Sequence, residues 1–331
     1  MKNVFRSGLR RGFTLIELMV ALAVTSLLVF GIMQMTIQGL DLWGKVREDV
    51  STSSSARFAL EAVAHDLESF QMRAGDNEYQ WLYANVDKKP IKGPRGMKIP
   101  RSVQCIFFAC APDRNPSVSS SERLRRNYRN ARSQNEETRG DVSAVGYRLL
   151  YRDHFLDISG DEDPNASDGA FPLFSLYRQV VPPNDTFDKL LGLKNLKSGY
   201  DAFGKNDKDF FLCENVLEMN VLFTIQYAKG KADVRSGSAD YDYVTVPVIT
   251  TKGEGAGQEV GVYGNCVKVG GKVYENARIV SANISITVLT EEGVQLAEQI
   301  RLGRRRAPNP AEFISKYTRS FSRMVSVPQP L

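Results

Sequence analysis

The stretch that decides the fold is residues 13–37, FTLIELMVALAVTSLLVFGIMQMTI. These 25 residues contain one charged side chain, Glu17, and no proline. A helix of this length rises about 37 Å at about 1.5 Å per residue, so it can cross a hydrocarbon core of about 30 Å with some tilt. The stretch therefore predicts a single membrane-spanning helix near the start of the chain.

The segment before this helix, residues 1–12, reads MKNVFRSGLRRG and contains four basic residues and no acidic one. Basic residues that flank a span favour the cytoplasmic side, so the rest of the chain is expected to be exported. The formal charge of the whole chain is +5, and most of that excess lies in this segment. The nearly neutral remainder argues against a dedicated nucleic-acid binder.

The position of the Glu17 carboxylate argues against two common explanations for such an N-terminus, a cleaved secretory signal and a plain membrane anchor. A conventional secretory signal cleaved after Ala21-Leu22-Ala23 would have a short apolar region that contains a charge, and the apolar run continues to Met33. A plain uncleaved anchor explains the length of the span. It does not explain a carboxylate inside the apolar segment, where an ionised group is costly and requires a partner.

Residues 10–18, RRGFTLIEL, resemble the prepilin-type cleavage and methylation motif of type IV pilins and type II secretion pseudopilins. The resemblance implies that prepilin peptidase cleaves between Gly12 and Phe13 and that the new Phe13 amine is N-methylated. Gly12 has no side chain, so a protease can approach its backbone closely. The resemblance further implies that Glu17 faces the Phe13 amine of a neighbouring subunit and fixes the axial register.

The apolar helix continues into an amphipathic pattern, so we expect residues 38–74 to form a helical extension. The serines at 51–55 are poor helix formers and predict a weak point near residue 51, and Gly75 is expected to end the helix. One apolar stripe has helical spacing, whereas the charged residues Arg57, Glu61, Asp66 and Glu68 lie mainly elsewhere. The stripe contains Ala56, Leu60, Val63, Leu67 and Phe70.

Residues 75–331 are expected to form a β-rich globular domain. Strand-like segments are residues 102–111, 143–152, 174–180, 216–227 and 277–293, and Gly270-Gly271 predicts the turn of a hairpin within residues 266–274. The fold class is therefore α+β, with a long N-terminal helix packed on an antiparallel sheet. Four polar stretches are expected to be surface insertions, namely residues 112–141, 157–170, 182–209 and 229–259.

The order of these segments resembles, more weakly, the J-type minor pseudopilins of type II secretion. The amphipathic ARFALEAVAHDLES of residues 56–69 precedes a strand that contains Tyr147-Arg148-Leu149. A segment that ends in Leu176-Tyr177-Arg178 follows, then a strand that opens at Asn215-Val216, and finally Ala277-Arg278-Ile279-Val280.

Residue patterns for catalysis or metal binding are sparse. The acidic loop of Asp157, Asp161, Asp163 and Asp168 has the oxygen ligands that calcium prefers, so it is a candidate calcium site, although it lacks the glycine and the distal glutamate of an EF-hand. The two histidines, His65 and His154, lie in no recognised motif, and no nucleotide-binding motif is present, so no cofactor is expected.

The four cysteines leave two alternatives open. In an oxidising exported domain one or two disulfides could form, or all four residues could be buried free thiols. Cys105 and Cys110 are disfavoured as a pair, because residues five apart in a strand point to opposite faces. The four residues are Cys105, Cys110, Cys213 and Cys266.

The predicted function is that of a minor pilin or pseudopilin, not an enzyme, in the bacterial inner membrane with its C-terminal domain in the periplasm. Its expected partners are prepilin peptidase, other pilins or pseudopilins and an inner-membrane assembly platform. Two alternatives remain. One is a membrane-tethered periplasmic enzyme. The other is a DNA-uptake module that binds through the basic residues at 304–306 and 319–323.

Overall fold

The computed structural model describes residues 14–73, 75, 78–90, 93–95, 97, 101–110, 142–153, 171–203, 210–229, 241–249 and 258–328. The chain divides into two compact units, Met1–Ser51 and Thr52–Leu331. The predicted insertions at 112–141 and 157–170 lie outside the described residues.

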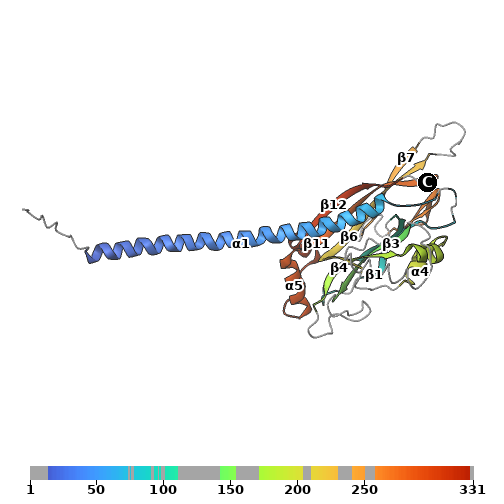
Figure 1. Ribbon diagram of the computed structural model, residues 1–331. Coiled ribbons are helices and arrows are strands. Elements are labelled where there is room, and N and C mark those ends of the chain that lie inside the picture. Colours follow the sequence, from blue (N-terminus) through green and yellow to red (C-terminus); the bar gives the residue numbers. More distant parts are fainter. Residues whose placement is uncertain are drawn as a thin grey trace, which may run out of the picture. The chain divides into compact units, whose positions relative to one another are not determined.

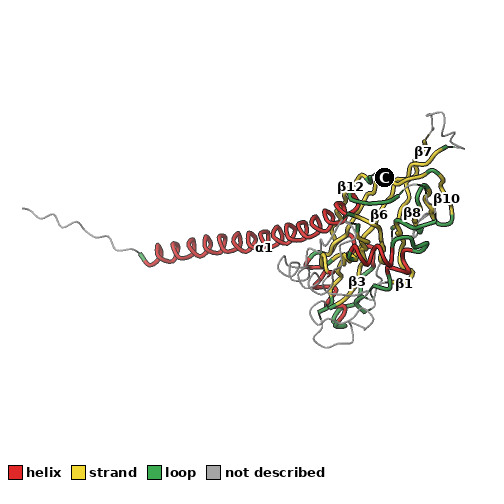
Figure 2. The backbone as a smooth tube through the Cα atoms, turned by 45° about the vertical axis from the view of Figure 1, so that its right-hand side comes forward, coloured by secondary structure: helices red, strands yellow, loops and turns green. Residues whose placement is uncertain are grey.

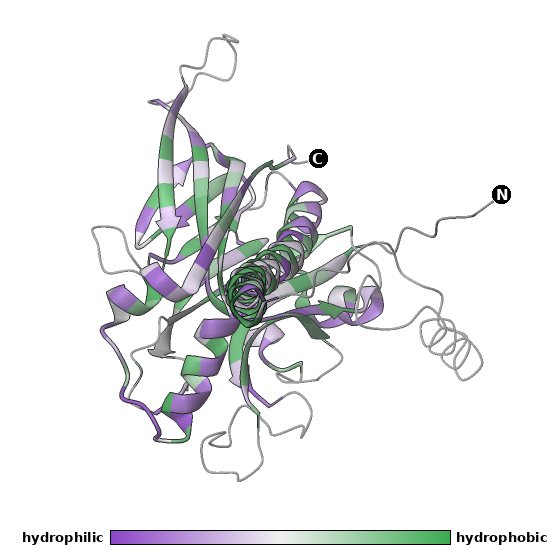
Figure 3. Cartoon of the chain, turned by 90° about the vertical axis from the view of Figure 1, so that its left-hand side faces the viewer, coloured by the Kyte–Doolittle hydropathy of each residue, from purple (hydrophilic) through white to green (hydrophobic). Residues whose placement is uncertain are grey.

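Helix α1 runs without interruption from Leu15–Glu68, through the boundary between the two units. Its residues in the first unit are exposed wherever their side chains are described. Figure 3 shows that the N-terminal part of this helix is predominantly hydrophobic. The predicted weak point near residue 51 coincides with the unit boundary, although the helix itself continues through it.

The helix ends at Glu68, earlier than the predicted end at residue 74. Phe70 forms a β-bridge with Ala109, and the amide of Gln71 donates to the carbonyl of Phe108 at 2.8 Å. The backbone leaves the helix at this point because its hydrogen-bonding groups pair with the end of a strand instead.

The second unit contains two sheets, in which all the strand pairs among the described residues are antiparallel. The larger sheet has the order β10-β9-β8-β1-β2-β3-β4-β5. Its strands are β1 (Leu82–Pro90), β2 (Arg101–Ala109), β3 (Ser143–Arg152), β4 (Leu173–Val181), β5 (Phe211–Glu214), β8 (Val260–Tyr263), β9 (Cys266–Val269) and β10 (Lys272–Glu275).

The smaller sheet has the order β12-β11-β6-β7. Its strands are β6 (Val216–Ala228), β7 (Tyr241–Val248), β11 (Ala277–Leu289) and β12 (Thr318–Ser326). A register shift between Ile279 and Ser281 marks a bulge in β11. Figure 1 shows β6, β11 and β12 alongside the C-terminal end of α1, and Figure 2 repeats the arrangement from another direction.

One hydrophobic core joins the C-terminal end of α1 to both sheets. The whole predicted stripe of the helix is buried, and the same core contains Phe107 and Val145 from the larger sheet and Phe223 and Ile284 from the smaller one. Figure 3 shows hydrophobic and hydrophilic residues alternating along several strands, as expected where one sheet face packs inward.

Asp66 corrects the prediction for the charged residues of this helical segment. Arg57, Glu61 and Glu68 are exposed as predicted, but Asp66 is only 3% exposed. The helical period alone places Asp66 near the edge of the stripe, so its burial required a partner that the sequence pattern does not reveal.

The structure also corrects the prediction of a surface insertion at residues 182–209, because residues 182–203 pack on the protein core. They form α3 (Pro183–Asp185), the π-helical turn η1 (Thr186–Leu190) and α4 (Leu196–Tyr200), and they cover the outer face of the larger sheet. Leu190 and Leu196 are fully buried against this face, which carries Ile106 and Phe108. The predicted insertion at 229–259 likewise contains β7.

Two further helices close one end of the core. α5 (Glu291–Arg301) begins at Thr290, whose hydroxyl accepts from the amide of Gly293 at 3.2 Å. α6 (Pro310–Tyr317) follows, and Leu296 and Phe313 from the two helices share a cluster with Phe174 of β4. The sequence pattern predicted only a turn after β11.

Candidate functional site

The predicted processing site lies at the edge of the described structure. Gly12 and Phe13 lie outside the described residues, which begin at Thr14. Glu17 is in the first turn of α1 and is exposed.

The carboxylate of Glu17 is bonded to Thr14. Both the amide and the hydroxyl of Thr14 donate to Glu17 Oε2 at 2.9 Å, and the amide of Glu17 donates to Thr14 Oγ1 at 3.3 Å. This reciprocal pattern is a capping box, in which two side chains satisfy amides that have no partner within the helix. The spacing Thr-x-x-Glu, from Thr14 to Glu17, is the sequence signal for this capping box.

Three hydroxyl side chains within the apolar span also have hydrogen-bond partners in the helix itself. The hydroxyls of Thr25, Ser26 and Thr36 donate to the carbonyls four residues earlier at 2.7, 2.8 and 2.9 Å. Such bonds remove the need for a water partner, which a hydrocarbon environment cannot supply. Among the described residues, α1 is the one helix that is long and apolar enough to cross a membrane.

A buried charged contact holds α1 to the larger sheet. Arg178 Nε lies 2.7 Å from Asp66 Oδ2, and Arg178 Nη2 lies 2.8 Å from Asp66 Oδ1. The hydroxyl of Tyr147 donates to Asp66 Oδ2 and accepts from Arg178 Nε at 3.2 Å. The side chains of Arg178 and Asp66 are only 2% and 4% exposed, so both charges are removed from water.

The environment of this contact stabilises the charged pair and the neutral phenol. Burial raises the pKa of Tyr147 well above its usual range, and the charge of Asp66 raises it further. Burial alone would lower the pKa of Arg178, but the hydrogen bond to Asp66 raises it above its ordinary value. The arrangement thus keeps one negative and one positive charge together inside the core.

In the structure all four cysteines are free thiols. Cys105, Cys213 and Cys266 are buried, and Cys110 is half-buried at the end of β2. Burial raises the pKa of both Cys105 and Cys213 to about 12, which leaves them protonated and unreactive at neutral pH.

Most residues of the predicted calcium loop and histidine positions lie in segments that the structure does not describe. Asp157, Asp161, Asp163 and Asp168 of the calcium prediction lie outside the described residues, and so does His154. His65 is exposed on α1. The described residues contain no group of three or more histidine, cysteine or acidic side chains arranged to hold a metal ion.

The basic residues near the C-terminus lie in two places. Arg304, Arg305 and Arg306 are exposed in the turn after α5, whereas Arg323 lies on β12 and faces α1. Arg323 Nη1 is 3.2 Å from Glu61 Oε1, and its Nη2 is 3.9 Å from Glu68 Oε1. Part of the predicted basic cluster is therefore neutralised within the chain.

Comparison with known proteins gives one match. Residues 9–33 match the prokaryotic N-terminal methylation motif, which covers Gly12, Phe13, Thr14 and Glu17. No curated protein and no solved structure matched the chain. The matched motif and the single long apolar helix that contains most of it support a membrane-anchored, prepilin-type protein that is processed by a prepilin peptidase.

Proposed function

We propose that this chain is a minor pilin or pseudopilin subunit of a periplasmic filament that serves type II secretion or a related pilus system. The observation that carries the proposal is the matched methylation motif, which leads into an apolar helix. Within residues 14–37 of this helical region, Glu17 is the one charged side chain. A carboxylate at this depth requires a partner, and assembly into a filament supplies one.

The capping box supports a two-state role for Glu17. In the isolated chain the carboxylate is bonded to Thr14. Cleavage after Gly12 would create a positively charged amine at Phe13, and in the filament Glu17 would bind that amine in a neighbouring subunit. A charged partner binds a carboxylate more strongly than a neutral hydroxyl does, particularly in a low-dielectric environment.

The J-type assignment belongs to the proposal and rests on the buried contact. Three of the segments that carry the resemblance, residues 56–69, the Tyr147 strand and the segment that ends at Arg178, meet at Asp66. An interaction among segments so distant in the sequence gives a structural reason for this order of residue types.

The remaining parts of the proposal concern location and activity. We propose that the second unit lies in the periplasm, because the basic leader favours the cytoplasmic side. The subunit would interact with other pilins or pseudopilins and with an inner-membrane assembly platform. It would act as a structural component that needs neither a cofactor nor an active site.

A cross-linking experiment tests this function. The full chain and its Glu17→Val variant would be produced together with prepilin peptidase and the other prepilin-type subunits of one system. We expect both chains to be processed, but only the wild-type chain to cross-link efficiently to those subunits. A Glu17→Asp variant is the matched control, because it keeps the charge and should retain part of the cross-linking.

Equal cross-linking by the wild-type and Glu17→Val chains would contradict the proposed role of Glu17. Processing without any cross-linking to prepilin-type subunits would contradict the filament function as a whole, and it would favour a tethered protein with another activity.

A further inference from the structure

A shallow pocket, open to solvent, lies on the outer face of the larger sheet, beside α4. It begins where the cover formed by α3, η1 and α4 ends. Tyr200, the last residue of α4, lies so close to Gly146 of β3 that a Cβ atom at residue 146 would overlap the tyrosine ring. The pocket is therefore bounded on one side by an aromatic ring that rests on the sheet backbone.

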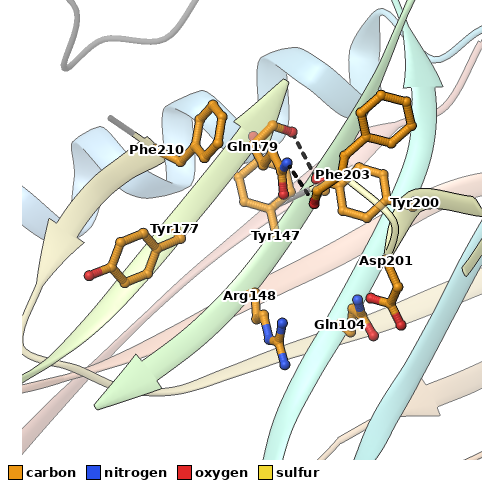
Figure 4. Close-up of a pocket in the computed structure, with 10 residues that line it drawn as sticks. Gln104, Tyr147, Arg148, Tyr177, Gln179, Tyr200, Asp201, Phe203 and Phe210 are labelled. Atoms are coloured by element: carbon orange, nitrogen blue, oxygen red, sulfur yellow. Dashed lines mark hydrogen bonds between the residues drawn. The ribbon is translucent and has the colours of Figure 1, made fainter. Parts of the chain in front are cut away.

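Hydrogen bonds to β4 fix this aromatic side of the pocket. The hydroxyl of Tyr200 donates to the carbonyl of Gln179 at 3.0 Å, and Gln179 Nε2 donates to the carbonyl of Phe203 at 3.3 Å. Figure 4 shows both bonds, with the rings of Tyr177, Phe203 and Phe210 around the same space. The pocket thus has a fixed apolar side that exists without a ligand.

Two polar side chains on neighbouring strands line the pocket without a partner of their own. Gln104 of β2 is only 7% exposed, and its amide makes no hydrogen bond to another described residue. Arg148 of β3 is half-buried and forms no ion pair or hydrogen bond within the described part of the chain. A side-chain amide of a residue this buried normally has a partner, so Gln104, with the positive charge of Arg148 on the neighbouring strand, points to a ligand.

The donors and the rings together define the ligand chemistry. A guanidinium group binds a carboxylate through two parallel N–H groups, and an amide can add a further donor. Asp201 also lines the pocket, and its negative charge opposes a multiply charged anion such as phosphate. The aromatic side favours an apolar group next to the single charge.

We propose that this pocket binds a carboxylate carried by an apolar group, with Arg148 as the charged ligand and Gln104 as the second donor. The carboxylate could belong to a free small molecule or to an acidic side chain of another polypeptide. The pocket is distinct from the N-terminal assembly motif, and the inference does not depend on the filament function.

Benzoate is a suitable probe, because it carries one carboxylate on a planar apolar ring, and benzamide is its neutral counterpart. Saturation-transfer NMR with the full chain in detergent would measure the binding of both. We expect saturable benzoate binding to the wild-type chain, binding at least tenfold weaker to Arg148→Gln, and weak binding of benzamide. Arg304→Gln is the control, because Arg304 is exposed outside the pocket.

Equal benzoate binding by Arg148→Gln and wild type, or equal binding of benzoate and benzamide, would overturn the proposal. Far-UV circular dichroism and the thermal midpoint check that Arg148→Gln is folded. A Gln104→Leu variant gives a second test, since the loss of the amide should weaken benzoate binding while the Arg148 charge remains.

An Arg148→Lys variant distinguishes the two sources of the carboxylate. In membranes treated with a carbodiimide, the lysine amine would form an amide with an activated carboxylate of a bound polypeptide. A new cross-linked species, absent from the wild type, would assign the carboxylate to an acidic side chain. Retained benzoate binding with no new species would assign it to a small molecule.

Discussion

Arg178 on β4 forms a two-point ion pair with Asp66 on α1, with N–O distances of 2.7 and 2.8 Å. The two residues are 112 positions apart in the sequence, and their side chains are almost completely buried. The pair lies within the hydrophobic core that joins the helix to the sheet. A buried charge is costly without its counter-charge, so the Asp66–Arg178 pair fixes the position of the C-terminal part of α1 along the sheet.

Removal of one partner of this pair should destabilise the second unit strongly. Asp66→Ala would leave the guanidinium of Arg178 buried without a counter-charge, which costs about 3–5 kcal/mol. Urea denaturation of the full chain in detergent, followed by fluorescence, would measure the free energy of unfolding. A double variant, Asp66→Leu with Arg178→Met, should recover much of the loss, because it leaves no buried charge.

The exposed pair between Glu61 and Arg323 is the matched control. Both side chains are substantially exposed, so Glu61→Ala should cost less than about 1 kcal/mol. If Asp66→Ala cost no more than Glu61→Ala, the buried pair would not hold the helix to the sheet.

The buried thiols predict a loss of stability at alkaline pH. Burial raises the pKa of Cys105 and Cys213 from 9.0 to about 12. Between these values the unfolded chain releases the thiol protons and the folded chain retains them, so the free energy of unfolding falls as pH rises. The expected slope is about 1.4 kcal/mol per pH unit for each thiol. Well below pH 9 both thiols are protonated in the folded and the unfolded chain, so their full contribution to the free energy of unfolding is present.

A double variant, Cys105→Ala with Cys213→Ala, isolates this effect. Its stability should vary much less than that of the wild type between about pH 8.5 and 9.5, where tyrosines with an ordinary pKa of about 10 are still mostly protonated in the unfolded chain. The quantity to compare is the slope and not the absolute stability, since the smaller side chains also leave cavities. Identical slopes would show that the thiols are not buried as described.

The close approach of Tyr200 to Gly146 predicts a steric effect. In Gly146→Ala the new methyl group would overlap the tyrosine ring, and movement of that ring would break its hydrogen bond to Gln179. Overpacking of this kind costs about 1–3 kcal/mol. In a Tyr200→Leu background the same alanine should cost much less, and a thermodynamic cycle would measure this difference. Additive costs would contradict the contact.

Segments with strong local signals were predictable from the sequence. The apolar stretch became α1, and residues 143–152 became β3 with the predicted limits. The hairpin turn is also confirmed, because Gly270 and Gly271 adopt φ values of 52° and 95°, which glycine adopts without strain. In these places local preference and tertiary packing favour the same structure.

Contacts between distant segments were not predictable in this way. The polar composition of residues 182–203 hid the few apolar side chains, such as Leu190 and Leu196, that bind this segment to the sheet. Asp66 has the residue type of an exposed helical position, and its burial depends on Arg178, which no local pattern connects to it. Gln104 and Arg148 similarly form one site only after β2 and β3 pair.

The most direct test of the account is the intact mass and N-terminal residue of the full chain, isolated from membranes that contain active prepilin peptidase. The account predicts a chain that begins at N-methylated Phe13 and lacks residues 1–12. A Gly12→Val variant should keep the leader and migrate as the longer form. A wild-type chain that still begins at Met1, while a known prepilin is cleaved in the same membranes, would contradict the prepilin-type assignment.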